Sequence, residues 1–87
     1  MPLPAIIERV KQVQAELGET QPDPARAPAV NTLKQALDTV MLDPTQATHY
    51  KGLGDKLLFH FIGFQIDHPK LAASMENLAN ELAKAGL

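Results

Sequence analysis

Three histidines are the side chains of this 87-residue sequence best suited to metal binding or acid–base chemistry: His49, His60 and His68. A metal site on a helix usually places histidines at positions i and i+4 of one face, or joins them to nearby carboxylates. No pair of these histidines has that spacing. The sequence therefore predicts no metal site and no cofactor. It assigns the histidines to solvent-facing or capping positions.

The adjacent pair Asp67-His68 is similar to a carboxylate that orients a general base. Neighbouring residues at a helix start point in different directions, however, and the chain has no cysteine that could act as a nucleophile. Its one serine, Ser74, lies inside a predicted helix. We interpret Asp67, His68 and Pro69 as a structural turn, because a residue before proline avoids the α region and proline suits a first helical turn. Catalytic residues are not expected, and the protein is not predicted to be an enzyme.

Nucleotide and nucleic-acid binding are also disfavoured. Gly52-x-Gly54 lacks the further glycines, the preceding strand and the Lys-Ser/Thr ending of a phosphate-binding loop. The eight lysines and arginines are spread along the chain, and the net charge is −2. Nucleic-acid binding normally requires clustered basic residues that displace counterions from phosphates.

Length and composition indicate one helical domain spanning residues 1–87, because 45% of the residues are apolar and the chain is too short for two domains. The absence of cysteine excludes disulfides and fits a reducing compartment. The longest apolar stretch, Leu57 to Ile66, is far shorter than the ~20 residues of a membrane span. No signal peptide is expected, because the first ten residues have neither a basic start nor a long apolar run. We therefore expect a soluble cytoplasmic protein without a membrane partner.

Apolar residues spaced three and four apart predict amphipathic helices over about residues 3–17, 29–42 and 69–85. Gly18 and Gly86 suit left-handed caps at the ends of the first and last of these helices. A Pro-rich loop over residues 19–28, stiffened by Pro22 and Pro24, separates the first two. The stripes that should face the core are Leu3, Ile6, Val10, Val13 and Leu17; Val30, Leu33, Leu37 and Val40; and Leu71, Met75, Leu78 and Leu82.

A further helix is predicted over residues 55–66, beginning at Leu53 or Asp55 because Gly52 and Gly54 weaken a helix before that point. At about 100° per residue, one face carries Leu53, Leu57, Phe61 and Phe64. Phe59 and Ile66 fall almost opposite this face. A strand over residues 57–61 also fits the alternation, but the chain offers no partner strand. A preceding short helical turn can start at Asp43-Pro44.

The predicted fold is all-α, with four amphipathic helices that form an antiparallel bundle or helical hairpins completed by dimerisation. A helix that is apolar on nearly all sides is either central or also buried by another chain. We expect helix three to supply both the centre of the bundle and an association face, so that the protein forms a homodimer. The predicted interface residues are Leu58, Phe59, Ile62, Gly63 and Ile66.

An alternative function belongs to a different class. A regulatory or inhibitory protein could dock a helix of another protein in an apolar groove around helix three. The same apolar residues would serve either function. A solution mass measurement would separate a dimer from a monomer that awaits a different partner.

The last third of the chain resembles the ending of a family of small bacterial proteins, domain-of-unknown-function family 4404. The segments that carry the resemblance are Phe64–Leu71, Leu78–Leu82 and the closing Gly86-Leu87. Gln65 stands where that family has an acidic residue, so the resemblance does not imply a role for a negative charge at this position. The resemblance implies a compact helical fold and a bacterial cytoplasmic setting. The family has no assigned activity to carry over.

Overall fold

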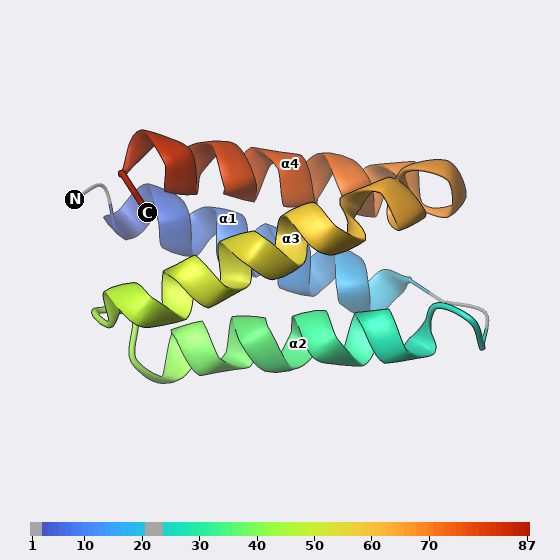
Figure 1. The fold of residues 1–87 in the computed structure, drawn as a ribbon, viewed down its shortest axis with the longest axis horizontal. Coiled ribbons are helices and arrows are strands. Elements are labelled where there is room, and N and C mark those ends of the chain that lie inside the picture. The colour runs from blue at the N-terminus through green and yellow to red at the C-terminus, as the bar shows by residue number, and fades with distance from the viewer. Residues whose placement is uncertain (1–2, 21–23) are drawn as a thin grey trace.

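The described part of the chain forms four antiparallel helices. The computed structural model describes residues 3–20 and 24–87, and Pro22 lies outside them. The helices are α1 (Leu3–Glu19), α2 (Ala27–Leu42), α3 (Ala47–Asp67) and α4 (Pro69–Lys84). Successive helices run in opposite directions along the long axis of the molecule (Figure 1). The prediction of an all-α antiparallel four-helix arrangement is confirmed.

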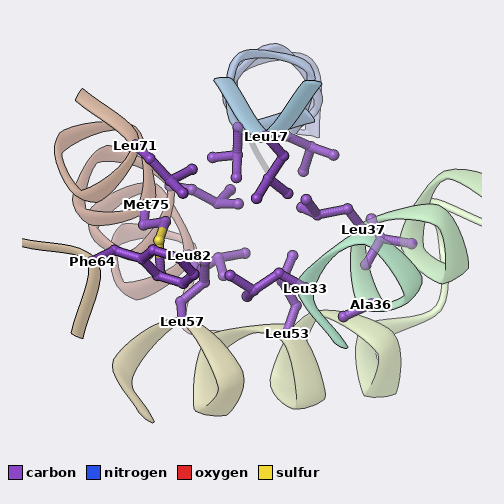
Figure 2. Close-up of a cluster of buried hydrophobic side chains, with 14 of the residues drawn as sticks. Leu17, Leu33, Ala36, Leu37, Leu53, Leu57, Phe64, Leu71, Met75 and Leu82 are labelled. Carbon is purple, nitrogen blue, oxygen red and sulfur yellow. The ribbon is translucent and has the colours of Figure 1, made fainter. Parts of the chain in front are cut away.

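Each helix occupies one corner of the bundle. α1 and α3 both pack against α2 and α4, and neither pair of diagonally opposed helices makes close contact. Figure 2 shows side chains from all four helices meeting between them. The expectation that helix three is central is therefore wrong. Short connections place each helix beside its neighbours in the chain, so α3 has a single face toward the core.

The core consists of the stripes that the spacing predicts. Buried residues are Ile6, Val10, Val13 and Leu17 of α1; Val30, Leu33, Ala36, Leu37 and Val40 of α2; and Leu71, Ala72, Met75, Leu78 and Leu82 of α4. α3 adds Tyr50, Leu53, Leu57 and Phe64. Leu3 is only half-buried against this cluster. Burial of each large apolar side chain contributes about 1.5–3 kcal/mol, so this cluster holds the helices together.

α3 is longer than the sequence predicts, because it begins at Ala47 instead of near Asp55. Gly52 and Gly54 lie inside the helix, where each costs about 1 kcal/mol relative to alanine. Tyr50 and Leu53 are buried by 99% or more in the shared core, with exposed fractions of 0% and 1%. This tertiary burial outweighs the weak intrinsic preference of the two glycines for helix.

The connection between α2 and α3 is a tight turn, which corrects the prediction of a helical start at Asp43-Pro44. Asp43 Oδ1 accepts hydrogen bonds from the Thr45 backbone N–H at 3.2 Å and from the Thr45 hydroxyl at 2.6 Å. These bonds hold the pKa of Asp43 below its usual value. The Tyr50 hydroxyl donates to the Pro44 carbonyl at 2.6 Å, which ties the turn to the first turns of α3.

The two predicted glycine caps have different outcomes. Gly86 has φ 78°, with backbone bonds from Leu87 N to Leu82 O at 2.9 Å and from Gly86 N to Ala83 O at 3.1 Å. This is the expected left-handed cap at the end of α4. Gly18 instead continues α1 as an ordinary helical residue. The helix ends after Glu19, where the Thr20 hydroxyl donates to the Glu16 carbonyl at 2.6 Å.

The Pro-rich segment between α1 and α2 is shorter than predicted. α1 continues through Glu19, and α2 begins at Ala27 with Pro28 in its first turn. Proline has no N–H to lose at this position, so it does not interrupt the helix. Pro24 lies in the turn that precedes α2.

Candidate interaction surface

The outer face of α3 carries four large apolar side chains that no other part of the described chain covers. Leu58 is 70% exposed, Phe59 81%, Ile62 70% and Ile66 82%. We refer to these four residues as the α3 apolar surface. All four are among the interface residues that the sequence predicts. Their exposure shows that the bundle itself does not enclose helix three.

The α3 apolar surface is confined to the C-terminal half of the helix, near the turn into α4 (Figure 1). At 100° and 1.5 Å per residue, the four side chains cover an arc of about 100° and a length of about 12 Å. The preceding turns of the same face carry Thr48, Lys51 and Asp55, which are exposed polar residues. The helix therefore changes from polar to apolar along one side.

The bundle geometry explains why this surface stays outside. Leu53, Leu57 and Phe64 already fill the part of the core that α3 reaches. Phe61 lies at the edge and is half-buried against the core cluster. Because a helix at a corner presents only one stripe inward, the apolar residues on its opposite side remain in water. A contiguous apolar patch of this kind marks a binding surface more often than single exposed residues do.

Gly63, the fifth predicted interface residue, lies on the flank of this surface beneath Arg26. A Cβ atom at Gly63 would come within 2.5 Å of Arg26 Nη1. Arg26 Nε in turn donates to Asp67 Oδ2 at 2.9 Å. The glycine thus admits a side chain that ties the start of α2 to the end of α3. Sequence reasoning missed Arg26, since only the tertiary structure brings it to Gly63.

Asp67, His68 and Pro69 lie where α3 passes into α4. His68 has φ −139° and ψ 72°, and its N–H donates to Phe64 O at 2.7 Å. Its own carbonyl accepts from Ala72 N at 3.0 Å, which begins α4. His68 occupies the N-cap position of α4, as its assignment to a capping position predicts, and it makes no side-chain cap bond. The Asp67 carboxylate binds Arg26 instead.

The three histidines occupy different environments. The ring of His60 is edge-on to Phe59, with centroids 4.9 Å apart, and partial burial lowers the pKa of His60. His49 is half-buried, and its Nδ1 has no hydrogen-bond partner among the described residues. Within residues 3–20 and 24–87, no three histidine or acidic side chains gather into a set that could hold a metal ion.

A groove between α3 and α4 adjoins the α3 apolar surface at Leu58. One hollow of about 700 Å³ is lined mainly by small and apolar residues, among them Gly54, Leu58, Leu82, Ala83 and Leu87. A smaller hollow of about 130 Å³ lies beside Leu58, Phe61 and Met75. The exposed apolar face therefore continues into a shallow depression on one side.

Comparison with protein-family models, with curated proteins and with solved structures finds no match for this chain. The family resemblance of the last third of the sequence thus stays a prediction. In the part of the chain that the structure describes, no helix has both the length and the apolar character needed to cross a membrane. The described residues form a small four-helix bundle with exposed apolar residues on α3.

Proposed function

We propose that this protein is a small non-enzymatic module that self-associates through the α3 apolar surface. The observation that carries the proposal is the exposure of Leu58, Phe59, Ile62 and Ile66 on one contiguous side of a helix. Exposed apolar residues scattered singly are normal in proteins, but a continuous patch of large ones is not.

The size of the patch fits a second copy of the chain. Four such side chains expose roughly 300–500 Å² of apolar area. A standard interface buries about 800 Å² on each partner, of which somewhat more than half is apolar. The α3 apolar surface thus supplies most of the apolar centre of one such interface. A two-fold contact places the same patch against itself, and a patch made entirely of aliphatic and aromatic groups is chemically self-complementary.

Sedimentation velocity across a wide range of protein concentrations tests this proposal. The expected result is a reversible dimer, with a dissociation constant on the order of micromolar because ordering costs offset much of the burial. Phe59→Asp should abolish the dimer by burying an unpaired charge. Thr48→Asp, on the polar half of the same face, is the matched control and should leave the dimer intact. A wild-type chain that stays monomeric at every concentration would refute the proposal.

The groove beside Leu58 favours a second candidate function, namely the docking of a helix from a different protein. Amphipathic helices bind in apolar grooves, and small and apolar residues make up most of the lining here. Ala83→Trp would fill the groove beside Leu58 and leave Phe59, Ile62 and Ile66 untouched, because these three residues do not line it. Helix docking predicts that Ala83→Trp abolishes binding of a stoichiometric partner to a monomeric chain. Self-association predicts that this variant still dimerises.

A further inference from the structure

The change from polar to apolar along the outer face of α3 constrains how two copies can meet. Thr48, Lys51 and Asp55 lie on the same face as the α3 apolar surface but nearer the N-terminus of the helix. In a parallel, in-register pair of α3 helices, each residue would lie beside its own counterpart. Lys51 would then meet Lys51 and Asp55 would meet Asp55 along the contact. Like charges placed opposite one another across an interface oppose association.

An antiparallel pair avoids this problem. The α3 apolar surface is centred on Ile62, with Leu58 one turn before it and Ile66 one turn after it. If the two helices run in opposite directions about a point near Ile62, Leu58 of one copy lies opposite Ile66 of the other. Residues 48–55 then extend past the end of the second α3 and remain in water. Their polar character fits that position.

We infer that two copies of this chain pair through antiparallel α3 helices about a two-fold axis near Ile62, so that Leu58 of each copy lies opposite Ile66 of the other. This inference rests on the proposed self-association and adds its orientation and register. It makes the second copy of the chain the partner that the α3 apolar surface fits. The polar residues 48–55 favour this direction, while the apolar residues supply the attraction.

Spin labels on single introduced cysteines test the orientation, because the chain contains no cysteine of its own. In the antiparallel pair, the distance along the helices between equivalent labels grows by about 3 Å for each residue away from the axis. With the two helix axes about 9 Å apart, pulsed electron paramagnetic resonance should give about 23 Å for Asp55→Cys and about 34 Å for Lys51→Cys, whereas Gln65→Cys should show short-range broadening from about 13 Å. Both long-range positions lie outside the α3 apolar surface.

The outcomes separate this inference from the proposed function. Distances that stay the same at positions 51, 55 and 65 in a dimer would overturn the antiparallel arrangement and leave self-association intact. The absence of any dimer, judged independently by sedimentation, would overturn both.

Discussion

At the scale of single residues, Gly52 and Gly63 have different roles although both lie in α3. No atom lies within 4 Å of where a Cβ of Gly52 would stand, whereas a Cβ of Gly63 would meet Arg26 Nη1 at 2.5 Å. Gly52 therefore only lowers the stability of α3, as glycine does inside any helix. Gly63 makes room for the side chain that bridges to Asp67.

We expect Gly52→Ala to raise the free energy of unfolding by about 1 kcal/mol, because alanine is the better helix former. Gly63→Ala should raise the free energy of unfolding by less, since the new methyl group displaces Arg26 from its ion pair with Asp67. In an Arg26→Ala background the two alanine substitutions should become equally stabilising. Urea denaturation of the wild-type protein, the three single variants and the two double variants measures these two double-mutant cycles. An unchanged difference between the two glycine positions in that background would contradict the role assigned to Gly63.

The pKa of His60 is lowered by partial burial, which makes stability depend on pH. The unfolded chain binds a proton to this ring more readily than the folded chain does. The contribution of neutral His60 to the free energy of unfolding is therefore complete above the ordinary histidine pKa of about 6.5. It is lost as the pH falls below that pKa. His60→Gln should flatten the stability profile between about pH 7 and 5. A profile as steep as that of the wild-type protein would contradict this prediction.

At the scale of elements, α3 shows how packing extends a helix beyond its local preferences. Helix-weakening glycines led to a predicted start near residue 55, and the helix in fact begins at Ala47. Burial of Tyr50 and Leu53 supplies the missing stability. The Tyr50 hydroxyl also anchors the turn before the helix.

Tyr50→Phe should lower the free energy of unfolding by about 1 kcal/mol, because it removes the hydrogen bond to the Pro44 carbonyl and keeps the ring. Hydrogen exchange should show faster amide exchange over residues 47–53 than in the wild-type protein. His49→Phe has no such bond to break and is a suitable comparison. Unchanged exchange in Tyr50→Phe would mean that the first turns of α3 do not depend on this contact.

At the scale of the whole molecule, α3 has one face in the core and another that the bundle leaves open. Phe64 is 1% exposed and Phe59 is 81% exposed, although they lie on the same helix five residues apart. The two phenylalanines should thus contribute to different equilibria. Phe64 stabilises the fold, and we propose that Phe59 stabilises the association of two copies.

Phe64→Ala should cost about 3–5 kcal/mol of folding stability by leaving a cavity in the core. Phe59→Ser should change the stability of the monomer by less than about 0.5 kcal/mol, since it alters an exposed side chain. Chemical denaturation at a protein concentration below the dissociation constant, followed by sedimentation of both variants, separates the two effects. A large loss of monomer stability in Phe59→Ser would show that this side chain belongs to the core.

Much of the fold follows from the sequence alone, because spacing of apolar residues determines which stripe of each helix can be buried. The stripes of α1, α2 and α4, the cap at Gly86 and the excess apolar character of α3 are all readable in this way. Local patterns cannot reveal which helices become neighbours, since that depends on contacts between residues far apart in the chain. Tertiary structure therefore decided that α3 occupies a corner, that Arg26 reaches Gly63, and that Leu58, Phe59, Ile62 and Ile66 remain exposed to water.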